Sequence, residues 1–187
     1  RNCVSGHYCA KGAAAPLPCD GGTYSSATDN DEQGDCTAAN PGYFATTGST
    51  QQTPCAPGSI APSAKMSACV LCPKGNFAAS GTACEQCEAG TYAAREGLSQ
   101  CTLCPHPLSS KSGDVTCSIC KEGFYLQDTS VLPDDIFRFP TKHCKACPPD
   151  VKCATNTTLE TLGVRRDYWR ASPLTTEIHK CDASDHC

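Results

Sequence analysis

Hydrophobic positions are sparse along this chain, and the clearest regularity is a short repeat. Leucine, isoleucine, valine and phenylalanine make up only 25 of the 187 residues. The recurring pattern is Cys-x-x-Gly-x-aromatic, followed by a polar stretch rich in Ser, Thr and Gly and then by a second cysteine. Because polar stretches of this kind form turns, the pattern predicts very short strands joined as hairpins, and almost no helix.

The cysteine content indicates how a chain so poor in apolar residues folds. It has 18 cysteines, about one residue in ten, as disulfide scaffolds do. So few large apolar side chains do not normally offset the conformational entropy lost on folding, so we expect covalent cross-links to replace a hydrophobic core. The even count allows every thiol to pair. Stable disulfides in turn predict an extracellular or cell-surface location.

Six units of the repeat carry an opening cysteine, and they lie between residues 19 and 144. We expect the glycine of each unit to take a turn conformation with positive φ, and the aromatic ring to pack on a disulfide. The units open at Cys19 (with Gly22 and Tyr24), Cys55 (with Gly58 and Ile60), Cys72 (with Gly75 and Phe77), Cys87 (with Gly90 and Tyr92), Cys104 (with Pro107 in the glycine position) and Cys120 (with Gly123 and Tyr125).

One further unit has lost its cysteines and indicates how the others pair. Gly42 and Phe44 mark this unit, but Ala39 stands at its opening position and Gln52 at its closing position. Both cysteines are absent together, which is expected if the opening and closing cysteines of a unit bond to each other. A crossed pattern between neighbouring units remains the alternative, because connectivity does not follow from sequence alone.

Pairing of nearest neighbours accounts for all the cysteines in nine disulfides. Closure of a loop of about 15 residues is worth roughly 3 kcal/mol by the chain-entropy argument, so each unit is expected to be held locally. The expected pairs are Cys3–Cys9, Cys19–Cys36, Cys55–Cys69, Cys72–Cys84, Cys87–Cys101, Cys104–Cys117, Cys120–Cys144, Cys147–Cys153 and Cys181–Cys187.

Several segments resemble a known family of cysteine-rich repeats. The run from Cys3 to Cys9 (CVSGHYC), the run from Pro18 to Ser25 (PCDGGTYS) and the run from Cys84 to Tyr92 (CEQCEAGTY) are similar to ephrin-receptor-like repeats, which are related in style to tumour-necrosis-factor-receptor repeats. The resemblance covers roughly residues 1 to 147. It implies an extracellular, non-catalytic spacer or interaction module, and it implies no particular ligand.

The tail has a resemblance of its own. The run from Leu162 to Ser172 (LGVRRDYWRAS) is similar to a Gly-Tyr-Trp-Arg segment that follows such repeats in large surface proteins, and Asp167 stands at the glycine position.

The expected fold class is small and disulfide-rich, an elongated tandem array in which each unit touches mainly its neighbours. We expect an incomplete N-terminal module over 1–18, tandem repeats over 19–147, and a segment over 148–187 that begins a further module. The chain is expected to be a piece of a larger protein.

Five Cys-x-x-Cys pairs raise the alternative of zinc binding. They are 69/72, 84/87, 101/104, 117/120 and 144/147, and their spacing suits zinc knuckles. Five pairs leave one unmatched in four-cysteine sites, however, and eight other cysteines stay unexplained. We therefore expect no metal, and a redox role lacks the βαβ context that it needs.

Other candidate chemistry is weaker. The segment from Asp29 to Asp35 begins like a calcium loop, but Asn40 stands where the bidentate Glu belongs, so we expect a solvated acidic insertion. His186 lies beside Asp185 without a nucleophile and its base, so no catalysis and no cofactor is expected. The net charge of −4, with no basic patch, argues against nucleic acid, and no apolar run is long enough for membrane insertion.

Three places are candidates for modification or contact. Asn156 begins the only Asn-x-Ser/Thr sequon and is expected to carry a glycan. The insertion from Leu126 to His143 holds Val131, Leu132, Ile136, Phe137 and Phe139, which form either a local core, the favoured interpretation, or a contact for another chain. The same choice applies to Trp169 with Arg165, Arg166 and Arg170, where internal packing, with arginine stacked on the indole, is favoured over docking on a following domain.

The sequence thus favours a structural or interaction module of a larger extracellular or cell-surface protein, with fibre formation as one form of this role. Its expected partners are other domains or copies in the same assembly. A ligand-binding ectodomain of a signalling receptor is the second interpretation, and a zinc-binding adaptor is the third.

Overall fold

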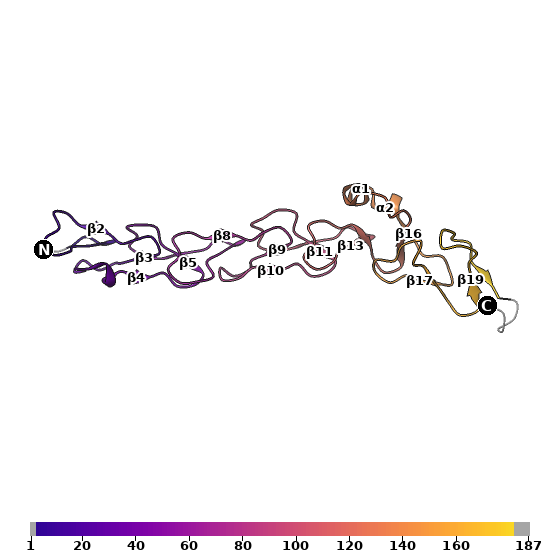
Figure 1. Ribbon diagram of the computed structural model, residues 1–187, viewed down its shortest axis with the longest axis horizontal. Helices are drawn as coiled ribbons and strands as arrows, with labels where there is room; N and C mark the ends of the chain where they lie inside the picture. Colours follow the sequence, from indigo (N-terminus) through magenta and orange to yellow (C-terminus); the bar gives the residue numbers. More distant parts are fainter. Residues whose placement is uncertain (1–2, 182–187) are drawn as a thin grey trace. The chain divides into compact units, whose positions relative to one another are not determined.

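Short antiparallel hairpins follow one another along the chain in the computed structural model, which describes residues 3–181 (Figure 1). Each hairpin forms a separate two-stranded sheet. The pairs are β1 (His7–Tyr8) with β2 (Leu17–Pro18), β3 (Thr23–Tyr24) with β4 (Thr37–Ala38), β5 (Tyr43–Phe44) with β6 (Thr53–Pro54), β7 (Ser59–Ile60) with β8 (Val70–Leu71), β9 (Asn76–Phe77) with β10 (Glu85–Gln86), β11 (Thr91–Tyr92) with β12 (Thr102–Leu103), β13 (Leu108–Ser109) with β14 (Ile119–Cys120), β15 (Phe124–Leu126) with β16 (Cys144–Ala146), β17 (Val151–Lys152) with β18 (Gly163–Val164), and β19 (Tyr168–Trp169) with β20 (His179–Lys180).

Within residues 3–181, helical structure is confined to three short elements: the 3₁₀ turn η1 (Gln33–Asp35) and the helices α1 (Pro133–Arg138) and α2 (Pro140–His143). Both α-helices begin at a proline, whose fixed φ suits the first helical position. Asp134 and Asp135 in the first turn of α1 and Arg138 in its last turn complement the helix dipole. The expected class, a small disulfide-rich fold of short hairpins with few helices, is confirmed.

The turn glycines fix the register of the hairpins. The glycine that precedes each first strand has a φ between 76° and 91° in the seven units that carry it, namely Gly6, Gly22, Gly42, Gly58, Gly75, Gly90 and Gly123. At Gly22 an added Cβ would also collide with the carbonyl oxygen of Lys65, and at Gly58 with that of Gly97. Glycine is thus required both for its backbone conformation and for the close approach of the unit after the next one.

Pro107 takes the glycine position in the unit that opens at Cys104. The peptide bond between His106 and Pro107 is cis, and Pro107 is fully buried just before β13.

Backbone hydrogen bonds extend a hairpin beyond its two strands and join it to the hairpin that follows, as at Gly22 and Gly42. The N–H of Gly22 donates to the carbonyl of Ala45 at 2.7 Å, and the carbonyl of Gly22 accepts from the N–H of Ala39 at 2.9 Å. Gly42 repeats both contacts, with Ala61 at 2.8 Å and with Cys55 at 2.9 Å. These bonds use no side chain, so they hold the register even where the sequence of the repeat varies.

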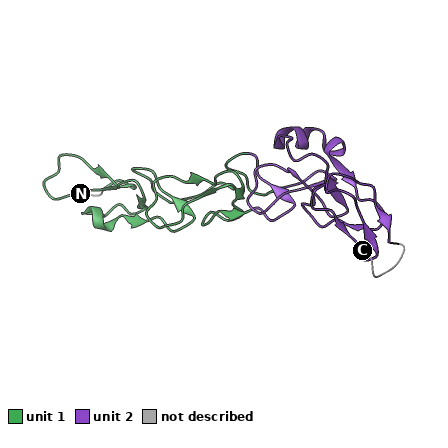
Figure 2. Cartoon of the chain, turned by 45° about the vertical axis from the view of Figure 1, so that its right-hand side comes forward, with its two compact units in different colours: residues 1–86, 95–101 green, residues 87–94, 102–187 purple. Residues whose placement is uncertain are grey.

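The chain divides into two compact units, formed by residues 1–86 with 95–101 and by residues 87–94 with 102–187 (Figure 2). In the first, the buried apolar side chains are cysteines and alanines only. They are Cys3, Cys19, Cys36, Ala39, Ala45, Ala61, Cys72 and Ala78. Disulfides and small side chains thus stand where a globular domain has large aliphatic residues.

The second unit holds two clusters of buried residues. The first cluster contains Leu108, Ile136 and cysteines of two disulfides. The other contains Tyr125, Val151, Leu162 and Cys153.

No helix in residues 3–181 has the length and hydrophobicity that crossing a membrane requires.

Candidate interaction surfaces

Disulfides close the hairpin units locally. Their Cα–Cα distances lie between 5.6 and 6.3 Å, the usual range for such bonds. The pairs are the nearest neighbours of the repeat: Cys3–Cys9, Cys19–Cys36, Cys55–Cys69, Cys72–Cys84, Cys104–Cys117, Cys120–Cys144 and Cys147–Cys153. Cys87, Cys101 and Cys181 are also disulfide-bonded. The expected partner of Cys181, Cys187, lies outside the described residues.

This pairing removes the basis of the zinc interpretation. A zinc site needs thiolates, and no cysteine among the described residues is free. In the pair 117/120, for example, Cys117 bonds to Cys104 and Cys120 bonds to Cys144. The Cys-x-x-Cys spacing therefore marks the junction between the closing cysteine of one unit and the opening cysteine of the next.

The unit without cysteines is held by a hydrogen bond instead. Ala39, at the opening position, is fully buried. The side-chain oxygen Oε1 of Gln52, at the closing position, accepts a hydrogen bond from the backbone N–H of Asn40 at 2.8 Å. A non-covalent contact thus replaces the cross-link that closes the neighbouring units.

The insertion before Cys144 is divided between core and surface. Ile136 is 3% exposed and packs in the core cluster with Leu108, while Phe137 meets Tyr92 edge to face with 5.5 Å between ring centroids. Ile136 is therefore a core residue, which corrects its place among the contact candidates. Phe139, under the guanidinium of Arg138, is 48% exposed and remains available to another molecule.

Trp169 and Arg170 do not form the expected stack. Trp169 lies on β19 opposite His179 of β20, and the two rings pack with 5.0 Å between centroids. The guanidinium of Arg170 instead donates to the carbonyls of Leu159, Glu160 and Pro173 at 2.7 to 3.1 Å. Arg170 thus fixes the loop, and Trp169 packs on His179 rather than on this arginine, with 46% of its surface exposed.

Asn156 is exposed at a turn, with a φ of 70°. Its backbone N–H donates to the carbonyl of Cys120 at 2.9 Å. Asparagine tolerates this left-handed conformation better than most residues. The exposed side chain keeps Asn156 a candidate for glycosylation.

The acidic segment that begins at Asp29 is used for local structure. The side chain of Asn30 is buried and donates to the carbonyl of His7 at 3.0 Å. Asp35 Oδ2 accepts from the backbone N–H groups of Asp31 and Glu32, and these hydrogen bonds hold the pKa of the Asp35 carboxyl below its usual value. Asp35, the last residue of η1, thus uses this oxygen in the capping-box hydrogen bonds at the start of η1.

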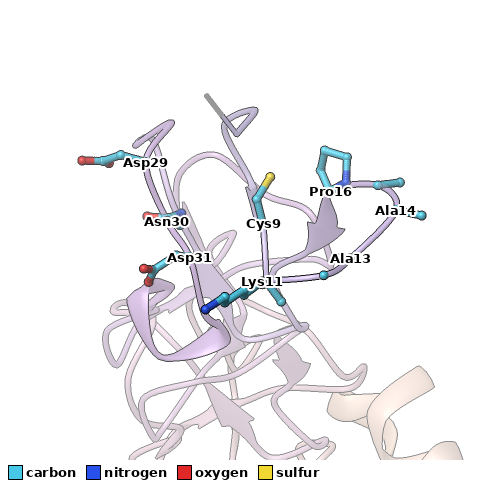
Figure 3. Close-up of a pocket in the computed structure, with 11 residues that line it drawn as sticks. Cys9, Lys11, Ala13, Ala14, Pro16, Asp29, Asn30 and Asp31 are labelled. Atoms are coloured by element: carbon cyan, nitrogen blue, oxygen red, sulfur yellow. The ribbon is translucent and has the colours of Figure 1, made fainter. Parts of the chain in front are cut away.

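A cavity of about 560 Å³ lies between this segment and the loop from Cys9 to Pro16. Figure 3 shows the side chain of Lys11 extending toward Asp31 within it. A lysine beside the acidic residue disfavours a cation there. Residues 3–181 contain no group of three or more His, Cys, Asp and Glu side chains arranged to hold a metal ion.

Two features of the repeat escaped the sequence analysis. A small buried residue follows the aromatic position in successive units, namely Ser25, Ala45, Ala61, Ala78 and Ala93. Its recurrence was visible in the sequence. In addition, the hairpin register continues through β17–β18 and β19–β20, where Asp150 and Asp167 replace the turn glycine with φ values of 53° and 68°. The sequence pattern places Asp167 at the glycine position, but it does not single out Asp150 or extend the repeat into this segment.

Comparison with known families gives one match. Residues 75–113 match the profile of the family described as tyrosine-protein kinase ephrin type A/B receptor-like. This segment contains the hairpins β9–β10 and β11–β12. No curated protein matches the chain.

Proposed function

Because the chain carries ephrin-receptor-like cysteine-rich repeats, we propose that it is a non-catalytic spacer and interaction module of a larger extracellular or cell-surface protein. The observation that carries the proposal is the local closure of each unit. Disulfides join positions only 6 to 24 residues apart, and backbone hydrogen bonds such as that from Gly22 to Ala45 join neighbouring hairpins. An array built in this way extends by adding units, because it needs no common core.

The oxidised cysteines support the extracellular location. Disulfides persist in secreted and surface proteins and are rare in compartments that keep thiols reduced. A fibre-forming or matrix role is the favoured form of the proposal, with other domains or copies of the same assembly as partners.

A ligand-binding receptor ectodomain is the second candidate, and a specific observation favours it. Leu132 and Phe139 flank α1 and are 68% and 48% exposed, so the insertion presents apolar surface that the array itself does not use. Such a surface suits a protein partner.

Two measurements test the proposal. The first is disulfide mapping by mass spectrometry of the secreted, unreduced chain, with thiol alkylation before any reduction. Local pairs without alkylated cysteines are expected, and many free thiols would contradict an extracellular module. The second is labelling of intact cells that express the parent protein with an impermeant reagent, which should reach this segment. The receptor candidate is favoured instead if Phe139→Ser abolishes binding of a soluble partner by the parent protein.

A further inference from the structure

A basic cavity lies on the β17–β18 hairpin and has no part in the repeat architecture. Its volume is about 360 Å³, within the range of small-ligand pockets. Strand pairing creates it by placing Lys152 opposite Gly163, directly before the two arginines. The lining residues are Lys152, Gly163, Val164, Arg165 and Arg166.

The three cations of this cavity are exposed and unneutralised. Lys152, Arg165 and Arg166 are all exposed, and no acidic side chain in the described part of the chain forms an ion pair with them. Arg170 differs from them, since its guanidinium is occupied by carbonyl oxygens. Three free positive charges thus gather in a chain whose net charge is −4. They repel one another unless an anion lies between them.

Gly163 leaves the cavity open, although the backbone conformation at this position does not require glycine. Its φ lies outside the left-handed region, unlike that of the turn glycines. A Cβ added to Gly163 would lie 3.8 Å from the carbonyl oxygen of Lys152, an ordinary van der Waals contact. A Cβ is therefore sterically allowed here, and the missing side chain widens the space beside Lys152.

We propose that this cavity binds the sulfate groups of an anionic polysaccharide. The planar guanidinium groups of Arg165 and Arg166 suit bidentate contact with a tetrahedral oxyanion, and Lys152 adds a point charge. All three are reached from solvent, as a polymer requires. The choice of a polysaccharide rests on the proposed extracellular function, whereas the affinity of the cavity for sulfate does not.

Binding of a heparin-derived hexasaccharide to the purified, oxidised chain tests the proposal, by isothermal titration calorimetry at physiological ionic strength. The double substitution Arg165→Gln/Arg166→Gln is expected to weaken binding about ten- to a hundredfold, the usual effect of losing charge-assisted hydrogen bonds. Gly163→Val fills the cavity and keeps every charge, and it should weaken binding to a similar extent. Gly163→Ala, the milder change, should give an intermediate affinity if the valine variant folds poorly.

The matched control is Lys74→Gln/Lys121→Gln, which removes the same charge from two exposed lysines outside the cavity. It should leave the affinity unchanged. The proposal is overturned if the control weakens binding as much as the arginine pair, if Gly163→Val binds like the unmodified chain, or if a desulfated hexasaccharide binds equally well. The proposal also fails if sedimentation shows that Arg165 and Arg166 mediate self-association of the chain instead. The binding assay uses the purified chain, so a negative result does not bear on the extracellular location. Disulfide mapping and cell labelling test that location separately.

Discussion

The backbone N–H of Asn40 donates to Oε1 of Gln52 at 2.8 Å, in the unit that opens at Ala39 and has no disulfide. In the units on either side, cysteines at the corresponding positions are covalently joined. A hydrogen bond on a half-exposed side chain is worth about 0.5 to 1.5 kcal/mol, whereas closing such a loop covalently is worth about 3 kcal/mol. The loop of this unit is therefore closed less stably than the loops of the two flanking units.

Restoring the missing cross-link should stabilise the protein. In the double substitution Ala39→Cys/Gln52→Cys, the two thiols stand in the repeat register of Cys104 and Cys117, which bond across the same sequence separation of 13 residues. We expect an additional disulfide and a gain of about 3 kcal/mol in the free energy of unfolding. Mass spectrometry after alkylation checks the bond, and thermal unfolding checks the gain. Two alkylated thiols per chain would contradict the common register.

Removing the hydrogen bond should open the same loop locally. Gln52→Ala deletes the acceptor of the Asn40 N–H, so the amide of Asn40 should exchange with solvent about five- to tenfold faster, as expected for a loss near 1 kcal/mol. Hydrogen exchange read by NMR measures this rate. Gln51→Ala changes an adjacent exposed side chain and is the matched control. Equal exchange rates in the two variants would show that Gln52 does not hold the loop.

The sequence predicts the repeat well because its register depends on few residues. A cysteine and a glycine three positions apart place each hairpin, so Gly22 or Gly90 identifies its turn without knowledge of the fold. At Asp150 and Asp167 this signal is absent. Backbone hydrogen bonds maintain the register there, as from the N–H of Cys181 to the carbonyl of Asp167 at 2.8 Å, and a sequence pattern does not reveal them.

Side-chain roles away from the repeat could not be predicted, because they depend on contacts between distant segments. Ile136 is buried by Leu108 and Cys144, and nothing in its local pattern separates it from exposed Leu132. Trp169 meets His179 through strand pairing, while the neighbouring Arg170 reaches back to Leu159. The basic cavity likewise exists only because β18 pairs with β17.

The core role of Ile136 is open to a matched comparison. Ile136→Ala leaves a cavity beside Leu108 and should cost about 2 to 5 kcal/mol of unfolding free energy. Leu132→Ala, four residues earlier and 68% exposed, should stay within about 0.5 kcal/mol. Chemical denaturation of the oxidised chain measures both. Similar losses in the two variants would be inconsistent with a core that includes Ile136 and excludes Leu132.

Acid should loosen the cap of η1. Its hydrogen bonds hold the pKa of Asp35 below the usual 3.8, so the carboxylate stabilises the folded turn above the unfolded pKa and loses this effect as the pH falls through the lower, folded value. The amides of Asp31 and Glu32 should therefore lose protection from hydrogen exchange only below about pH 4. In Asp35→Asn, which has no carboxylate, the exchange should show no such pH-dependent step. A step that persists in this variant would assign the effect to another group.

The tandem repeats in the sequence predict an extended molecule in solution. Neighbouring hairpins hydrogen-bond to one another, as Gly22 does to Ala45 and Gly42 to Ala61, and a repeat array requires no core common to all its units. Small-angle scattering should therefore give a radius of gyration well above the about 16 Å of a compact domain of this length. Deletion of residues 55–71 removes one unit together with both cysteines of its disulfide, Cys55 and Cys69. The variant should remain fully oxidised and have a smaller maximum dimension. A radius near the compact value, unchanged by the deletion, would mean that the units fold back on one another, and the spacer role would lose its physical basis.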